Sequence, residues 1–402
     1  MAMGTPRDHL PKSITENHVA ALLESISSPT PEAIRQLKVT AAFHIIYIVN
    51  YAPSQLDSWL SSKGISTRQE YSPSELILRI SGNHISKIKT NNEAAVLSWL
   101  HDNTDIPVPQ VVAHDSSIDN PLKHEYILMT REPGESLSDV YDTLGSDRMD
   151  SILDQLIDIN AELHKHTWSH IGGLSLDKHG AIVPGPVLEE TFWFEPDIAA
   201  LWPAGETYSS LNILGPFDSY VDYISAHLLK YKHAIDVHSS LKYMHDVFPQ
   251  LERFLEIIAE EPMKSKLNNI PLRLAHKDLH FANILIDPST ARITSIIDWE
   301  FAGVVPFTRW NPSRAFLWNA QDSPTSRDEK TALMERYKQK ARGRGLGYLV
   351  DDAEFTSEEQ ENMQTAATYL RVVVDVSPRG EATASVMDWK QMAVKAMTAL
   401  GA

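Results

Sequence analysis

The sequence contains no cysteine among its 402 residues. Disulfide bonds, thiolate zinc sites, iron–sulfur clusters and thiol nucleophiles are therefore excluded. Long apolar runs are missing as well, since the longest, at 43–49 and 293–297, are far shorter than the roughly 18 residues that a membrane-spanning helix requires. The first residues, MAMGTPRDHLPKS, lack the apolar stretch of a secretory leader. We expect a cytoplasmic protein that does not bind a membrane.

Basic residues are also scarce relative to acidic ones. The chain has 53 Asp and Glu against 36 Lys and Arg, which gives a formal net charge of −17. A nucleic acid is therefore not expected as a partner, because its phosphate backbone is bound through an excess of positive charge. The rest of the composition, 43% hydrophobic and 22% charged, is that of an ordinary globular protein. This length suits about two or three structural units, or one enzyme of two lobes.

The order of the predicted elements divides the chain into three parts. Residues 1–36 are expected to form an N-terminal helical extension, because a capping box at 13–16 precedes apolar residues at helical spacing. Residues 37–130 favour a sheet with one inserted helix, with strand patterns within 37–79, at 110–114 and at 126–130, and a helix over 87–101. Residues 131–402 favour helices, predicted over 147–166, 217–234, 245–261, 327–341 and 358–374. Strand patterns interrupt this helical part at 273–276, 283–286 and 292–297.

One segment, residues 274–303, carries a pattern with chemical meaning. His276, Asp278 and Asn283 form H-x-D-x-x-x-x-N, and Asp298 follows at the end of a predicted strand. A loop followed by a β-hairpin returns the chain to its starting point, so these side chains are expected to meet. Phosphoryl transfer uses such a set: a carboxylate that takes the proton of the acceptor hydroxyl, and an amide oxygen and a second carboxylate that hold magnesium. The two aspartates could instead cap backbone N–H groups, which is an ordinary role of Asp in loops.

The same segment resembles a known family. HKDLHFANI, IIDWEFAGVVP and RWNPSRAFLW are similar to stretches of the aminoglycoside phosphotransferase and choline kinase family, and most similar to its fungal branch. The resemblance implies an α+β, bilobal protein-kinase-like fold, with a small antiparallel-sheet N-lobe at 37–130 and a larger, mainly helical C-lobe at 131–402. It also implies that Asp278 is the catalytic base, that Asn283 and Asp298 bind Mg²⁺ and that His276 braces the catalytic loop. ATP would then lie between the lobes.

The resemblance extends to residues that would bind the nucleotide. Arg79 in LILRI stands where the family places its phosphate-pairing cation, and Glu93 in NNEAAVLSWL stands where a helix glutamate pairs with it. Without that context, the two would be interpreted as a surface ion pair of little energetic value. Met129 and Arg131 belong to the segment that resembles the nucleotide hinge.

The loop between the first two strands departs from the family pattern. The family usually has a glycine or serine there, and its backbone N–H groups cradle the phosphates. This chain has Thr40, Ala41 and Ala42 at those positions, and no glycine. Alanine keeps the N–H group but does not reach positive φ as cheaply as glycine does. Arg79 also replaces the commoner lysine, which keeps the charge and changes the geometry.

We therefore expect a kinase that transfers the γ-phosphoryl group of ATP to a hydroxyl of a small molecule. Two alternatives stay open: a catalytically retired kinase fold that binds a ligand or partner, and a kinase fold used for another step of metabolite biosynthesis. An acidic segment could favour a cationic acceptor such as an amino sugar or amino alcohol, or could be a solvated face; its members are Glu189, Glu190, Glu195, Asp197 and Glu206. The sequence does not determine the oligomeric state.

Overall fold

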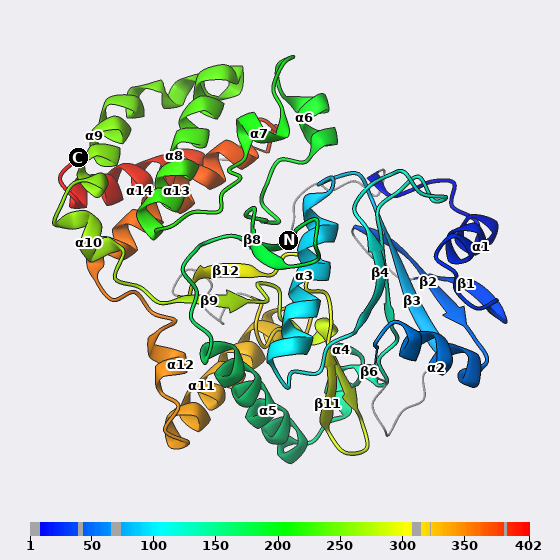
Figure 1. The fold of residues 1–402 in the computed structure, drawn as a ribbon. Helices are drawn as coiled ribbons and strands as arrows, with labels where there is room; N and C mark the ends of the chain where they lie inside the picture. Colours follow the sequence, from blue (N-terminus) through cyan, green and yellow to red (C-terminus); the bar gives the residue numbers. More distant parts are fainter. Residues whose placement is uncertain (1–8, 39–42, 66–73, 308–314, 322, 382–383) are drawn as a thin grey trace.

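The computed structural model of the protein describes residues 9–38, 43–65, 74–307, 315–321, 323–381 and 384–402. These residues form two lobes, a smaller one built on an antiparallel sheet and a larger one that is mainly helical (Figure 1). The predicted bilobal α+β architecture is confirmed. Within the described residues, no helix is both long and apolar enough to cross a membrane.

The small lobe contains a five-stranded antiparallel sheet in the order β1-β2-β3-β5-β4. Its strands are β1 (Ala33–Leu37), β2 (His44–Asn50), β3 (Glu75–Ser81), β4 (Val111–Asp115) and β5 (Tyr126–Thr130). Helix α3 (Ile88–Asn103) lies between the sheet and the large lobe, whereas α1 (Glu16–Ser25) and α2 (Pro53–Ser62) lie on the far side of the sheet (Figure 1). Strand β3 is central, so its side chains are held between β2 and β5.

Two details of the small lobe differ from the sequence prediction. Strand β1 begins at Ala33, inside the segment 1–36 that was predicted as a helical extension, and pairs with β2 as the edge strand of the sheet. Its residues are exposed or half-buried, so the strand lacks the apolar pattern that would have revealed it. Helix α2 was not predicted either, although Leu56 and Leu60 bury one face of it at i, i+4 spacing.

Alternation along β3 decides which side chains reach the space between the lobes. Leu76, Leu78 and Ile80 are fully buried in the core beneath α1 and α2. Because successive strand residues point to opposite faces, Ile77 and Arg79 face the other way, toward the large lobe. The alternation of side chains along β3 thus places the cation Arg79 on the face of the sheet that looks toward the large lobe.

The large lobe contains most of the helices and three small sheets. Its helices are α4 (Leu137–Val140), α5 (Ser146–His164), α6 (Glu195–Leu201), α7 (Tyr208–Leu211), α8 (Tyr220–Val237), α9 (Phe248–Ala259), α10 (Met263–Leu267), α11 (Pro324–Gly343), α12 (Tyr348–Asp351), α13 (Glu358–Val376) and α14 (Ser385–Ala399). Short 3-10 helices are η2 (Tyr141–Thr143), η3 (Ser239–Val247) and η4 (Phe281–Asn283). The strands are β6 (Glu135–Ser136), β7 (Gly173–Leu176), β8 (Ile182–Gly185), β9 (Leu272–Ala275), β10 (Ile284–Asp287), β11 (Arg292–Ile296) and β12 (Gly303–Pro306). They pair as β11-β10-β6, β12-β9 and β7-β8.

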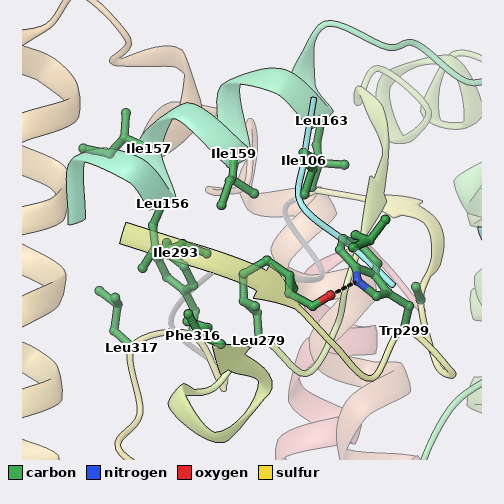
Figure 2. Packing of buried hydrophobic residues seen from close by; sticks show 14 of the residues in the cluster. Ile106, Leu156, Ile157, Ile159, Leu163, Leu279, Ile293, Trp299, Phe316 and Leu317 are labelled. Carbon is green, nitrogen blue, oxygen red and sulfur yellow. Dashed lines mark hydrogen bonds between the residues drawn. The ribbon is translucent and has the colours of Figure 1, made fainter. Parts of the chain in front are cut away.

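The predicted hairpin is present and is anchored on the core of the large lobe. Strands β10 and β11 pair antiparallel, with Ile284 opposite Ile296. Side chains of α5 and β11 meet in one buried cluster, in which Leu156 and Ile293 take part (Figure 2). Trp299 extends this cluster beyond the end of β11, and its indole Nε1 donates a 3.0 Å hydrogen bond to the carbonyl oxygen of Ile296 (Figure 2). This packing fixes the direction in which the chain leaves the hairpin.

Candidate active site

A cleft of about 550 Å³ lies between the two lobes. The small lobe contributes side chains of β2, β3 and β5 that face the cleft. They are His44, Ile46, Ile77, Arg79 and Met129. The large lobe contributes the loop after β9, the hairpin and the residues after β11, including Asp278, Asn283, Asp298 and Glu300. The two carboxylates and the amide of the predicted motif therefore line the same cleft as Arg79, the predicted phosphate-binding cation.

Arg79 and Glu93 are in direct contact. The guanidinium Nη1 donates to a carboxylate oxygen of Glu93, which lies on α3. The side chain of Arg79 is 11% exposed and that of Glu93 is 2% exposed, so the interpretation of the two as a surface ion pair is wrong. An arginine placed this way has its charge held in the cleft by a buried partner. Burial raises the pKa of Glu93 above its usual value, and the charge of Arg79 opposes that rise.

Asp298 bridges the two lobes by binding the same arginine. Its carboxylate Oδ1 accepts a 2.6 Å hydrogen bond from Nη2 of Arg79. Asp298 has a positive φ of 69°, a conformation that a non-glycine residue seldom adopts. Burial alone would raise the pKa of Asp298, but the charge and hydrogen bonds of Arg79 outweigh it and hold this pKa below its usual value. The carboxylate is therefore ionised in the cleft.

His276 joins the loop after β9 to the end of the hairpin. Its ring Nε2 lies 2.8 Å from the carbonyl oxygen of Ile297, and its Nδ1 lies 3.3 Å from the backbone nitrogen of Asp278. The carbonyl can only accept and the amide can only donate, so the proton is on Nε2 and the ring is neutral. Burial lowers the pKa of His276, which agrees with this assignment. The ring thus links the backbone of Asp278, the predicted base, to the backbone of Ile297, which precedes the predicted metal ligand Asp298.

Asn283 is held beside the same loop. Its side-chain Nδ2 donates a 2.8 Å hydrogen bond to the backbone carbonyl oxygen of Asp278. The backbone carbonyl oxygen of Asn283 accepts a 3.0 Å hydrogen bond from the backbone N–H of Ile297. The side-chain oxygen Oδ1 accepts no hydrogen bond from the described part of the chain. Asn283 and Asp298 thus supply an amide and a carboxylate oxygen to one cleft, and both are ligand types that Mg²⁺ prefers. The donor set fits the predicted metal.

The remaining predicted nucleotide residues divide into two groups. Met129 and Arg131 both line the cleft, at the connection between the lobes. Arg131 is paired with Glu75, at the start of β3, so its charge is already partly satisfied. Thr40, Ala41 and Ala42 lie outside the described residues.

Three buried residues complete the site but were missed by sequence reasoning. Lys89 on α3 is 1% exposed, and its ammonium contacts the carboxylate of Glu300 and, at 2.7 Å, Nε2 of His44. Nδ1 of His44 lies 3.0 Å from Nη2 of Arg79. Burial, followed by the charges of Arg79 and Lys89, lowers the pKa of His44 well below its usual value, so this ring is neutral. Two signals were available: Lys89 precedes Glu93 by one helical turn, and Glu300 follows Asp298 at i, i+2.

The cluster around Lys89 also limits what else this end of the cleft can hold. Among groups of at least three His, Asp or Glu side chains in the described residues, His44, Glu93 and Glu300 have ligand atoms close enough together to hold a metal ion. The ammonium of Lys89 and the guanidinium of Arg79 already lie among these three groups. A dication would have to displace two fixed cations, so the three residues are better explained as partners of Lys89 and Arg79.

The acidic segment of the sequence is not one solvated face. Glu189 and Asp197 are buried, and they contact Tyr223 and Arg379, respectively. Glu206 is half-buried beside His233, and Glu195 is exposed. Glu190 lines the cleft together with Asp278. Only one of the five carboxylates is therefore placed to meet a molecule in the cleft.

Residue Glu190 is presented by a backbone segment that is fixed from two sides. Nζ of Lys277, the neighbour of Asp278, donates to the carbonyl oxygen of Leu188. Glu189 accepts a hydrogen bond from the hydroxyl of Tyr223 on α8. The loop after β9 and α8 thus hold the residues immediately before Glu190.

Residues 65–308 match the model of the phosphotransferase enzyme family. A subtelomeric hrmA-associated cluster protein of Aspergillus fumigatus, found in two strains, is 27% identical over 280 residues, which make up 59% of this chain and 54% of that protein. The chain thus spans about half the length of the curated relatives it matches.

Among the solved structures that align with most of this chain are aminoglycoside phosphotransferases. APH(4)-Ia aligns over 96% of this chain and 100% of its own, with 14% identity and a TM-score of 0.45. The gentamicin complex of APH(2")-IIa aligns over 97% of each chain, with 12% identity and a TM-score of 0.48. The span of the family match, 65–308, contains every described residue of the predicted site, from Arg79 to Asp298.

Proposed function

We propose that this chain, which belongs to the phosphotransferase enzyme family, transfers the γ-phosphoryl group of ATP to a hydroxyl group of a small molecule. One observation carries the proposal: Asp278, Asn283 and Asp298 line the same cleft, and Arg79 faces them from the small lobe. A carboxylate base, an amide and carboxylate pair of oxygen ligands and a phosphate-binding cation are the groups that this reaction requires.

Asp278 is assigned as the base. As the acceptor oxygen bonds to the γ-phosphorus and the bond to the β,γ-bridging oxygen of ATP breaks, the proton of the hydroxyl passes to the Asp278 carboxylate and ADP leaves. His276 and Asn283 hold the backbone of Asp278 from both sides, and this fixes the position of the base. Most of the rate acceleration in such a reaction comes from positioning and electrostatics, so a rigid loop matters as much as the base itself.

Mg²⁺ is assigned to Asn283 and Asp298. When bound there, the ion would neutralise charge on the phosphates. Asp298 is ionised and Asn283 offers its Oδ1, so the two residues need no proton loss to act as ligands.

The nucleotide is assigned to the cleft face of the small-lobe sheet. Ile46, Ile77 and Met129 form an apolar surface that suits a purine ring. Arg79, two residues beyond Ile77 and so on the same face of β3, is assigned to the phosphates, which it would bind while Glu93 keeps it in place.

The acceptor is assigned to the part of the cleft that Glu190 and Asp278 line. A fixed carboxylate there favours an acceptor that carries an ammonium group near its reacting hydroxyl, such as an amino sugar or an amino alcohol. Phe301 also lines the cleft, and an aromatic ring there would attract such a cation.

A second candidate function is ligand binding without turnover. Its support is the position of His44, which occupies one side of the Arg79 guanidinium, the group assigned to the phosphates. A nucleotide would have to share or displace that contact.

The test is a phosphoryl-transfer assay on a panel of small hydroxyl compounds, with and without an amino group. Each compound is incubated with the protein, ATP and Mg²⁺, and products are identified by mass spectrometry as additions of one phosphoryl group. The Asp278→Asn variant is the control for contaminating kinases. Formation of a phosphorylated compound by the wild-type protein alone supports the proposal, whereas ATP binding with no product from any compound favours the second candidate.

A further inference from the structure

Lys89 is a fully buried cation for which the proposed reaction has no direct use. It lies on α3 one turn before Glu93, it is 1% exposed, and it does not line the cleft. The ring of Phe43 lies over its ammonium, with 5.8 Å between Nζ and the ring centroid. Burying an ammonium is expensive unless charged or polar partners satisfy it, so this lysine needs a structural explanation.

The partners of Lys89 are groups that also compete for Arg79. The carboxylate of Glu300, which contacts Nζ of Lys89, has its Oε2 3.7 Å from Nη2 of Arg79. His44 contacts Lys89 through Nε2 and Arg79 through Nδ1. His44 therefore contacts both cations at once, and Glu300 lies within ion-pair distance of both.

Arg79 already has two carboxylate partners. Nη1 donates to Glu93 and Nη2 donates to Asp298. A nucleotide phosphate can replace Asp298 on Nη2, because Asp298 is also assigned to the metal. Glu300 has no such second role in this account, so its charge must be balanced elsewhere if Nη2 is to become available.

We propose that Lys89 is a positioning residue that holds Glu300 away from Arg79 and so keeps the Nη2 side of Arg79 available to the nucleotide phosphates. The proposal rests on the proposed function, because it takes Arg79 to be the phosphate-binding cation. It explains why a buried lysine is paired with a carboxylate that lines the cleft: without Lys89, Glu300 would move the short distance to Arg79 and form a pair that the nucleotide must break.

The first test compares ATP binding by single variants. Lys89→Met removes the ammonium and keeps the length of the side chain. Its dissociation constant for ATP, measured by calorimetry with MgCl₂ and again with EDTA, is expected to rise by about tenfold or more, the effect of one charge-assisted hydrogen bond. Lys232→Met is the matched control, because Lys232 forms an ion pair with Glu252 on the surface of the large lobe. Its ATP affinity should not change.

The second test separates a positioning role from direct binding and from general destabilisation. Glu300→Gln, introduced into Lys89→Met, removes the competing charge together with its partner. If Lys89 acts through Glu300, the double variant recovers ATP affinity to within about threefold of the wild-type protein, because no extra carboxylate then reaches Arg79. Should Lys89→Met fail to fold, the double variant still gives a result, since it leaves no unpaired buried carboxylate.

The possible results distinguish a failure of the Lys89 assignment from a failure of the proposed function. ATP affinity lost in Lys89→Met and recovered in the double variant supports the proposal. Unchanged affinity in Lys89→Met, or a double variant as weak as the single one, overturns the assignment of Lys89 while the proposed function stands. A wild-type protein that binds no ATP with or without Mg²⁺ overturns both.

Discussion

Nη2 of Arg79 lies 2.6 Å from Oδ1 of Asp298, so one hydrogen-bonded ion pair joins the central strand of the small lobe to the end of the hairpin in the large lobe. The same arginine is assigned to the phosphates and the same aspartate to the metal. Binding of metal and nucleotide must therefore replace this pair with two new contacts. The two ligands are expected to depend on each other for this reason.

The first prediction concerns that dependence. Asp298→Ala should abolish the gain in ATP affinity that Mg²⁺ provides, whereas Asp278→Ala should keep most of it, because only Asp298 is assigned to the metal. Without Mg²⁺, Asp298→Ala should bind ATP at least as tightly as the wild-type protein, since Arg79 is then released from its carboxylate partner. Calorimetry with and without Mg²⁺ measures both effects. Equal loss of Mg²⁺-dependent affinity in the two variants would show that the roles are wrongly assigned.

The second prediction concerns the buried pair of Arg79 and Glu93. Arg79→Met leaves the Glu93 carboxylate buried without its principal partner and should lower the free energy of unfolding by about 3–5 kcal/mol. Arg79→Lys keeps a cation and should lose less. Arg253→Met, which breaks an exposed pair with Glu256, is the control and should change stability by about 1 kcal/mol or less. Urea denaturation measures all three, and a loss in Arg79→Met no larger than in the control would contradict the account.

The resemblance to a known family led to Arg79, and alternation along β3 explains in the structure why this side chain faces the cleft. The motif spacing led to Asp278 and Asn283, which the structure brings into contact. The hairpin then brought Asp298 to the same place, as its register required.

Residues whose meaning depends on distant partners could not be predicted in this way. Lys89 and Glu300 are separated by 211 positions and become a pair only when α3 packs on the residues after β11. The spacing of Lys89 to Glu93 and of Glu300 to Asp298 places each residue near the site, but neither spacing shows that Lys89 and Glu300 form a pair with each other. Strand β1 was missed for a different reason: an edge strand whose residues are exposed or half-buried carries no apolar alternation.

The third prediction concerns stability at acid pH. His84 is buried and stacked on Phe43, with 4.6 Å between ring centroids, and neither of its ring nitrogens has a hydrogen-bond partner among the described residues. Burial, helped by the charges of Lys89 and His9, lowers the pKa of His84 to about 2. The unfolded chain takes up this proton near pH 6.5 and the folded chain does not, so His84 stabilises the folded state above that pH. Its contribution is lost at about 1.4 kcal/mol per pH unit as the pH falls below 6.5.

His84→Phe keeps an aromatic ring at this position and removes the titrating group. Its free energy of unfolding should therefore fall less steeply than that of the wild-type protein between pH 6.5 and pH 4.5. The exposed His179, replaced by Gln, serves as the control and should leave the slope unchanged. Parallel pH curves for the wild-type protein and His84→Phe would mean that His84 is not buried as a neutral ring.

The fourth prediction concerns His276. His276→Leu removes both hydrogen bonds that tie Ile297 to Asp278 and should lower kcat by about 10–100-fold, a typical effect of losing a residue that orients a reactive group. The Kd for ATP should change much less, because the ring touches no group assigned to the nucleotide. Steady-state kinetics and calorimetry provide the two numbers. A variant that loses ATP affinity and keeps kcat would place His276 in the nucleotide site instead.

The central claim is that Asp278 is the base of a phosphoryl transfer, and the Asp278→Asn variant tests it most directly. The amide keeps the size of the side chain and does not accept the proton of the acceptor hydroxyl. Once the assay has identified an acceptor, the measurement is kcat of this variant beside its Kd for ATP and its melting temperature. We predict that kcat falls by about 100-fold or more, in keeping with the loss of a general base, while affinity and melting temperature change little. Full activity of Asp278→Asn would contradict the account.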